Sequence, residues 1–340
     1  MAYLTKVLAA LHLAVTVATA EAIKVVPFNQ WHHQRILTWH TIGPLLAQNY
    51  TVICPDNRGM GASTIPLSRD YTSETVAGDF KAILDFFGIE QAYFLGHDKG
   101  APPLAALAMQ QPSLVSKVIF AEMMLPAFGF ENLHIPKPWW DTFQNWHLAW
   151  YLVPEVAAFF AHGRVKELLT WYIWHGSYSG ISQLPHDHLE SYTRELSKPG
   201  YLEAGFGYFK SIWKDGEYFN RTLKKEPLKQ PILVLGGESN FAPAEYLHQH
   251  YDPVGTDVQV DVIPHAGHWI GEENPQWTAS RIHQFLSEGN SILSVDLSSF
   301  VNRVTLSGAD TASAENLVHY ENQAAKQETS TAKSSEKSEL

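Results

Sequence analysis

Short apolar stretches alternate along much of this chain with longer stretches of helical periodicity. Apolar runs bounded by polar or turn-forming residues are typical of buried strands, and they occur at residues 23–28, 50–54, 91–95, 115–121, 232–235 and 258–263. Helices are predicted at 72–87, where apolar residues recur at helical spacing, and at 104–109 and 277–286. Because strands that alternate with helices pair in parallel through right-handed crossovers, the pattern predicts an α/β fold with a mostly parallel sheet flanked by helices.

This alternation stops between residues 123 and 229. Aromatic residues and histidines recur there at helical spacings, as in residues 146–150 and 171–174. They predict a helical cap that is inserted after one strand and covers the C-terminal edge of the sheet, where open α/β sheets bind ligands. The predicted domains are the first part of the core at 23–123, the cap at 124–229 and the second part of the core at 230–288.

The two ends of the chain differ from this body. Residues 1–22 are typical of a targeting segment, with Lys6 before an apolar run and Ala18-Thr19-Ala20 as a cleavage site. The run is too short for an integral membrane span. Two interpretations stay open: a signal peptide of a secreted protein, or an N-terminal helix that packs on the domain of a cytoplasmic protein. Residues 289–340 are predicted to be a mostly disordered tail, because 307–340 are rich in Ser, Thr, Ala, Glu and Lys.

The composition narrows the classes of function. The chain has 340 residues, which suffice for one large core with an inserted subdomain. Its formal net charge is −11 and it has no basic run, so it is not expected to bind nucleic acid. The single cysteine, Cys54, excludes internal disulfides, and no spacing of histidines or carboxylates indicates a metal site, so neither a metal nor another cofactor is expected.

Gly96-His97-Asp98-Lys99-Gly100 stands between the strand at 91–95 and the helix at 104–109. Strand, Gly-x-Asp-x-Gly and helix make the nucleophile-elbow pattern with a carboxylate at its tip. The tip residue occupies a strained turn, and the glycines allow strand and helix to pass closely. The helix N-terminus favours negative charge, which keeps Asp98 ionised. The alternative is a plain strand-to-helix turn.

Three motifs together resemble the α/β-hydrolase superfamily: Asp56-x-Arg58-Gly59-x-Gly61-x-Ser63, the Asp98 elbow and His265-Ala266-Gly267-His268-Trp269. The chain looks most like the branch of soluble epoxide hydrolases and haloalkane or haloacetate dehalogenases, over roughly residues 23–288. The resemblance implies an α/β-hydrolase fold with an inserted helical cap. It also implies that Asp98 attacks an electrophilic carbon to form an alkyl–enzyme ester, and that His268 activates the water that hydrolyses this ester.

The resemblance further implies a carboxylate that orients His268. In many relatives the acid is an Asp after the strand matching 232–235, but this chain has no Asp in that loop and offers Glu238 instead. In a subset that resembles haloalkane dehalogenases, the acid is a Glu after the strand that leads into the cap, which matches Glu122. We therefore assign Glu122, with Glu238 in reserve, and note His265 as a competitor of His268.

The substrate oxygen or leaving halide needs hydrogen-bond donors. Relatives use two tyrosines, or a histidine and a tyrosine, from the cap, and His147, next to Trp146, matches the histidine. The position that matches the tyrosine is Phe209, and the adjacent Tyr208 is turned by about 100° on a helix. The backbone N–H of Lys99 is the expected oxyanion donor. The predicted substrate-binding residues are thus His147, Tyr208, Trp146 and Lys99.

A second departure concerns the other oxyanion donor. Relatives carry a His-Gly-x-Pro turn there, whereas this chain has residues 30–33, Gln-Trp-His-His. Two functions therefore stay open. The first is a hydrolase that opens an epoxide of an apolar small molecule, or alternatively cleaves a carbon–halogen bond, and the intact set Asp98, Glu122 and His268 favours it. The second is a catalytically weakened homologue that acts as a binding protein. A serine esterase is not expected because no Gly-x-Ser-x-Gly occurs. The sequence does not indicate the oligomeric state.

Overall fold

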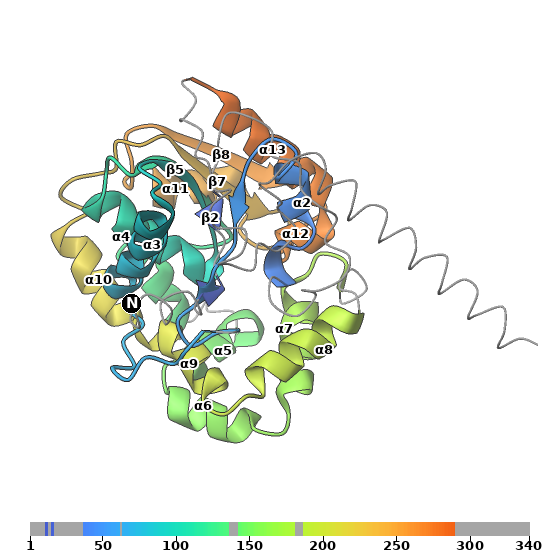
Figure 1. The fold of residues 1–340 in the computed structure, drawn as a ribbon. Coiled ribbons are helices and arrows are strands. Elements are labelled where there is room, and N and C mark those ends of the chain that lie inside the picture. The colour runs from blue at the N-terminus through green and yellow to red at the C-terminus, as the bar shows by residue number, and fades with distance from the viewer. Residues whose placement is uncertain are drawn as a thin grey trace, which may run out of the picture.

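The computed structural model describes residues 11–12, 15–16, 37–61, 63–135, 142–180 and 186–289 (Figure 1). Its central sheet consists of β5 (Ala92–His97), β6 (Val115–Ala121), β7 (Ile232–Gly237) and β8 (Val258–Ile263), which lie side by side in this order and run parallel. Leu95 lies opposite Ile119, which lies opposite Leu233. The mostly parallel sheet predicted from the apolar runs is thereby confirmed.

Helices cover both faces of this sheet, which explains why β5, β6 and β7 are almost entirely buried. Phe94 and Phe120 pack on one face against α3 (Ser73–Phe87), α4 (Ala101–Gln110) and α11 (Ala244–Tyr251). Leu95 and Ile119 pack on the opposite face against α2 (Ile42–Leu46) and α13 (Pro275–Ser287). Successive strand residues therefore enter two separate cores.

The chain between β6 and β7 forms helices in the parts that the structure describes. In Figure 1, α5 to α9 lie as a group below the sheet, and α10 lies beside α3 and α4. The elements are η3 (Phe130–His134), α5 (Thr142–Tyr151), α6 (Pro154–Ala161), α7 (Val165–Gly176), α8 (His186–Leu196), α9 (Tyr201–Lys210) and α10 (Ile212–Arg221).

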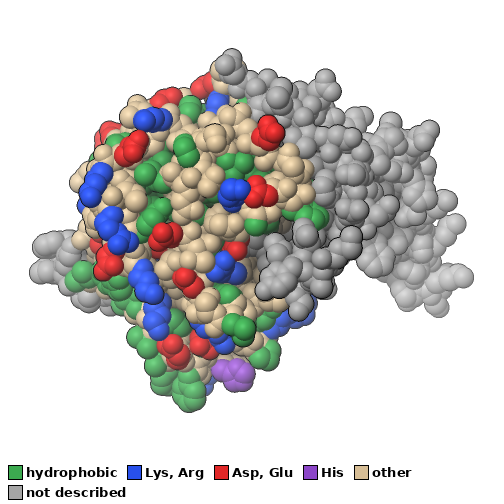
Figure 2. Space-filling view, turned by 60° about the vertical axis from the view of Figure 1, so that its left-hand side comes forward, with side chains coloured by type: hydrophobic (Ala, Val, Ile, Leu, Met, Phe, Trp, Pro, Cys, Tyr) green, Lys and Arg blue, Asp and Glu red, His purple; other side chains and the backbone are tan. Residues whose placement is uncertain are grey.

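The outer end of this helical group is apolar. Figure 2 shows hydrophobic side chains gathered at the lower end of the molecule, the level at which Figure 1 places α6. Phe159 and Phe160 of this helix are 75% and 65% exposed. Among the described helices, none has both the length and the apolar character needed to cross a membrane.

Two short strands come from the segment that resembles a signal peptide. β1 (Leu11–His12) pairs antiparallel with β4 (Asp56–Asn57), and β2 (Val15–Thr16) pairs antiparallel with β3 (Val52–Ile53). Removal of a leader spanning residues 1–22 would take these partners from β3 and β4. A cleaved signal peptide and secretion stay predictions.

Several expectations fall outside the described residues. These are the strand at 23–28, the turn at 30–33 and, apart from its first residue, the tail at 289–340. Within the described residues, the helix expected at 104–109 begins earlier, at Ala101, because prolines in the first turn of a helix cost no hydrogen bond.

Candidate active site

Asp98 lies at the tip of a tight turn that joins β5 to the short η2 (Asp98–Gly100) and then to α4. Its φ is 48°, in the left-handed region that non-glycine residues rarely adopt. A Cβ on Gly96 would lie 2.7 Å from the carbonyl oxygen of Gly100, so strand and helix approach too closely for a side chain. This is the strained elbow that the Gly-x-Asp-x-Gly pattern predicts.

Three of the predicted residues meet at the C-terminal edge of the sheet. Asp98 follows β5, Glu122 follows β6, and His268 lies on the loop between β8 and α12 (Ile270–Glu273). The Nε2 atom of His268 lies 3.5 Å from Oδ2 of Asp98, and its Nδ1 atom lies 3.2 Å from Oε2 of Glu122. One imidazole therefore connects two carboxylates from neighbouring strands.

Glu122 is fixed by more than His268. Glu122 is 1% exposed, and its carboxylate accepts hydrogen bonds from the backbone N–H of Gly237 and from Nδ2 of Asn240. The reserve acid, Glu238, has a side chain that is 46% exposed and accepts a hydrogen bond of 2.7 Å from the backbone N–H of His265. The structure thus brings Glu122 to His268 and leaves Glu238 and His265 paired outside.

The electrostatics couple these groups tightly. Burial would raise the pKa of Asp98, but the hydrogen bond and charge of His268, with smaller effects of His97 and Lys99, lower it to about 2. Burial would lower the pKa of His268, but the hydrogen bonds and charges of Asp98 and Glu122 raise it to about 10. At neutral pH the site therefore holds an ionised Asp98 beside a protonated His268.

A cavity of about 210 Å³ opens at this pair. Besides Asp98 and His268, its lining includes Thr38 and Trp39 of η1 (Leu37–Trp39), and Tyr208 and Phe209 of α9. Lys99 also lines it, with Nζ 3.8 Å from the ring centre of Phe130 and 4.4 Å from that of Phe209. Burial lowers the pKa of Lys99 to about 7, against the opposing charges of Asp98 and Asp215. Among the described residues, no cluster of three or more side chains suited to a metal ion occurs.

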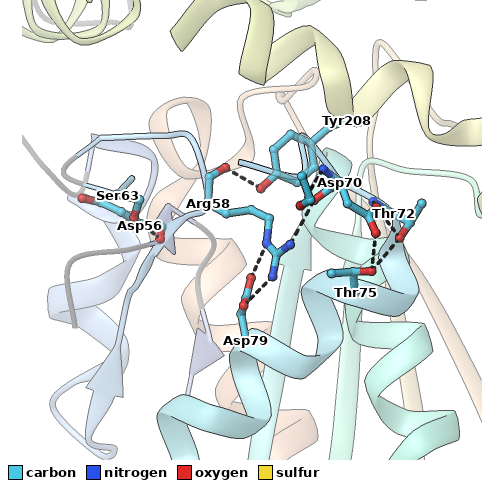
Figure 3. A network of polar contacts seen from close by, with 9 residues as sticks. Asp56, Arg58, Ser63, Asp70, Thr72, Thr75, Asp79 and Tyr208 are labelled. Atoms are coloured by element: carbon cyan, nitrogen blue, oxygen red, sulfur yellow. Dashed lines mark hydrogen bonds and ion pairs between the residues drawn. The ribbon is translucent and has the colours of Figure 1, made fainter. Parts of the chain in front are cut away.

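Two of the predicted substrate contacts, Tyr208 and Trp146, lie in different surroundings, and their contact with substrate stays a prediction. The hydroxyl of Tyr208 donates a hydrogen bond of 2.9 Å to the carbonyl oxygen of Arg58, so its proton is already committed (Figure 3). Trp146 is 37% exposed, and its ring packs on the rings of Trp150 and Trp171. Tyr208 therefore contributes its ring to the cavity wall, and Trp146 belongs to the outer aromatic packing of the cap.

Arg58 of the first motif has a structural task. Its guanidinium binds both carboxylate oxygens of Asp79 at 2.6 Å and the carbonyl oxygen of Asp70 at 3.0 Å (Figure 3). Within the same turn, Oγ of Ser63 donates to the carbonyl oxygen of Asp56. Since the Arg58 carbonyl accepts from Tyr208, this turn links the body to α9, one wall of the cavity.

The cap histidine and two cap tyrosines lie near Asp98. His147 is buried, and its pKa is lowered to about 3, mainly by burial, so its ring is neutral. Its ring centre lies 5.4 Å from those of both Tyr151 and Tyr172. Burial and the charge of Asp98 raise the pKa of both phenols, and a hydrogen bond to Asp98 acts on Tyr172 as well. Sequence reasoning missed both tyrosines because they stand in aromatic runs whose helical spacing does not reveal which ring faces the sheet.

Known proteins share this architecture. The family model described as the α/β hydrolase fold matches residues 28–275. A fluoroacetate dehalogenase of Burkholderia sp. is 23% identical over 270 residues, which cover 76% of this chain and 85% of the relative. A soluble epoxide hydrolase of Corynebacterium sp. is 23% identical over 267 residues, with 73% and 85% covered. For mouse epoxide hydrolase 3 the identity is 26% over 247 residues, and this chain spans 62% of its length.

Solved structures show the same likeness. The crystal structure of Cfl2 from Burkholderia cenocepacia superposes with a TM-score of 0.67 at 25% identity, and the match covers 73% of this chain and 83% of Cfl2. The epoxide hydrolase CorEH gives a TM-score of 0.65 at 21% identity, with 74% and 86% covered.

Proposed function

Because this chain belongs to the α/β hydrolase fold family, we propose that it is a hydrolase that opens epoxides of apolar small molecules through a covalent ester on Asp98. The observation that carries this proposal is the line of contacts from Asp98 through His268 to Glu122 beside a cavity. An ionised carboxylate on a strained turn is a suitable nucleophile for carbon. Relatives named as epoxide hydrolases support the substrate class.

The reaction has two steps. A carboxylate oxygen of Asp98 attacks an epoxide carbon, the bond from that carbon to oxygen breaks, and the oxygen takes up the proton that His268 gives up, so that a hydroxyalkyl ester forms. His268 then takes a proton from water, which adds to the ester carbonyl and releases the diol and the Asp98 carboxylate. Water and substrate supply every atom of the product, so no cofactor is required.

The pKa of His268 gives these steps their order. In the free enzyme, the hydrogen bonds and charges of Asp98 and Glu122 overcome burial and raise this pKa to about 10. Esterification removes the charge of Asp98, so the pKa falls and His268 can become a base. Formation of the ester on Asp98 thus lets His268 act as the base that activates the hydrolytic water.

A carbon–halogen bond is the second candidate. The similarity to a fluoroacetate dehalogenase favours it, because the same carboxylate attack would expel a halide instead of opening a ring. A catalytically weakened binding protein is less well supported. Burying an imidazole between two carboxylates costs desolvation free energy, and ligand binding alone does not require such an arrangement.

Intact-protein mass spectrometry tests the proposal. The His268→Gln protein, mixed with panels of epoxides and halo-acids, should gain the mass of one epoxide, or of one halo-acid less hydrogen halide, because its ester cannot be hydrolysed. The gain should disappear in the Asp98→Asn, His268→Gln double variant. Glu238→Gln is the matched control, since this carboxylate lies outside the site, and its turnover should equal that of the unmodified protein. Failure of every electrophile to label Asp98 would overturn the proposal and favour a binding protein.

A further inference from the structure

Lys99 carries an amine at the wall of the cavity, next to the nucleophile. The residue lines the same space as Asp98 and His268 and is only partly buried. Its Nζ atom lies 3.8 Å from the ring centre of Phe130 and 4.4 Å from that of Phe209. Among the residues that the structure describes, none forms a hydrogen bond or an ion pair with this amine. The nitrogen therefore contacts two aromatic rings and is not engaged by a carboxylate or a carbonyl group of these residues.

The charges that face Lys99 come from three elements. Asp98 of η2 and Asp215 of α10 oppose its positive charge, whereas His134 of η3 is neutral, because burial and the charge of Lys99 lower its pKa to about 3. Burial outweighs both carboxylates and lowers the pKa of Lys99 to about 7. Aromatic faces attract an ammonium group, but they replace only part of the hydration that it loses. A large fraction of the molecules therefore carries the neutral amine at neutral pH.

We propose that Lys99 is a second nucleophile in this cavity and captures apolar aldehydes as a Schiff base. A lysine that is desolvated in an apolar pocket is an activated nucleophile for carbonyl carbon. The side chains of Trp39, Tyr208 and Phe209 line the cavity, so its walls favour an aromatic or aliphatic aldehyde. This activity does not depend on the proposed epoxide opening, since it uses a different nucleophile.

The groups that line the cavity suffice for each step of the capture. The neutral amine adds to the carbonyl carbon, and a proton moves from nitrogen to oxygen to give a carbinolamine. His268 is protonated in the free protein and gives a proton to the carbinolamine hydroxyl, which leaves as water. The product is an iminium ion, whose positive charge is stabilised by the Asp98 charge that already acts on Lys99. Water reverses the same steps and returns the proton to His268, so the capture is reversible.

Two other lysines serve as controls within the same chain. Lys117 is 6% exposed, but its Nζ donates to the carbonyl oxygen of Phe285 at 2.6 Å, which stabilises the protonated form. Lys210 is exposed and pairs with Glu155 at 3.3 Å. Neither residue lines the cavity beside Asp98, so neither should react rapidly at neutral pH.

The experiment treats the full-length protein with benzaldehyde and sodium cyanoborohydride at pH 7. The hydride reduces the iminium ion to a stable benzylamine, and peptide mapping by mass spectrometry gives the labelling rate at each lysine and separates Lys99 from the N-terminal amine. The neutral fraction of Lys99 exceeds that of an exposed lysine by roughly 10³-fold at this pH. Because a less basic amine is also a weaker nucleophile, we expect Lys99 to be labelled roughly 10²-fold faster than Lys210, and Lys117 to stay unlabelled.

A pH series and one variant test the physical cause. In the unmodified protein, the labelling rate at Lys99 should rise with pH and reach half of its maximum near the pKa of about 7. Asp98→Asn removes a charge that raises this pKa, so the midpoint should move to lower pH. The same variant should form no ester with epoxides, which shows the two nucleophiles to be independent.

The outcomes separate this capture from the proposed hydrolase. Equal labelling of Lys99 and Lys210 at pH 7, or a midpoint at the ordinary lysine pKa of about 10.4, overturns capture by Lys99. A midpoint that Asp98→Asn leaves in place overturns the iminium ion beside Asp98, and with it the proposed step. None of these results bears on the hydrolase, which is overturned separately if no epoxide or halo-acid labels Asp98 in the His268→Gln protein.

Discussion

Replacing Glu122 by glutamine tests the centre of the site with a nearly isosteric change. The buried carboxylate accepts hydrogen bonds from Gly237, Asn240 and Nδ1 of His268. A glutamine offers one oxygen and one NH₂ group, so an N–H must face another donor. The imidazole also loses the negative charge that stabilises its protonated form.

The magnitude follows from the geometry. Unit charges separated by the 3.2 Å between Nδ1 of His268 and Oε2 of Glu122 interact by about 5 kcal/mol at an effective dielectric constant of about 20. At about 1.4 kcal/mol for each pKa unit, the pKa of His268 should fall from about 10 into the ordinary range of histidine. The second step, which needs a correctly oriented imidazole, should slow by about 10³–10⁴-fold, the scale known for such a change in a serine-protease triad.

Two measurements check this expectation. NMR titration of the imidazole signals gives the pKa of His268 without any substrate, and single-turnover kinetics on an epoxide that labels Asp98 give the rate of ester hydrolysis. Glu238→Gln is the control, because its carboxylate is half-exposed and binds the loop at His265. If Glu238→Gln lowers the pKa and the hydrolysis rate while Glu122→Gln leaves both unchanged, the assignment of the acid is wrong.

Three further predictions concern stability. Burial raises the pKa of Glu272 to about 8, so the free energy of unfolding falls as pH rises from the unfolded pKa near 4.5 through 8. In urea titrations, Glu272→Gln should therefore be more stable than the unmodified protein by on the order of 3–5 kcal/mol at pH 9 and equally stable at pH 4. Asp215 accepts hydrogen bonds from the N–H and Oγ of Ser73, so Asp215→Ala should cost about 1–3 kcal/mol and lower the melting temperature in calorimetry. In Gly96→Ala the new methyl group meets the carbonyl of Gly100 at 2.7 Å, so both melting temperature and ester formation should drop, and an unchanged variant would contradict the tight elbow.

The sequence predicts the central strands and the residues that directly follow them, because both depend on short stretches of neighbouring residues. The strands β5, β6 and β7 are almost entirely buried, so their composition alone identifies them. Parallel strands end at one edge, so residues that follow β5 and β6 meet there, which places Asp98 and Glu122 together. The choice of Glu122 rests on the absence of an Asp in the loop after β7 and on the resemblance to haloalkane dehalogenases.

The directions of individual cap side chains could not be predicted, because two of the cap helices carry clusters of aromatic residues. Residues 146–151 include three Trp or Tyr residues and a histidine, and residues 171–174 include three Trp or Tyr residues, so periodicity does not tell which ring faces the sheet. Trp146 turns outward and Tyr172 turns toward Asp98, although both stand in such runs. Their directions depend on where backbone groups of the cap bind the body, which no local pattern encodes.

Small residues help to position the cap, because they allow close contact between backbones. A Cβ on Gly267 would lie 2.3 Å from the carbonyl oxygen of Gly176, and that same carbonyl accepts the N–H of His268. A side chain at residue 267 would push α7 away and take the Tyr172 hydroxyl with it. The glycine before His268 therefore helps to set how closely the loop that carries this histidine approaches α7. The position of His268 thus depends partly on backbone atoms, namely its own N–H and the carbonyl oxygen of Gly176.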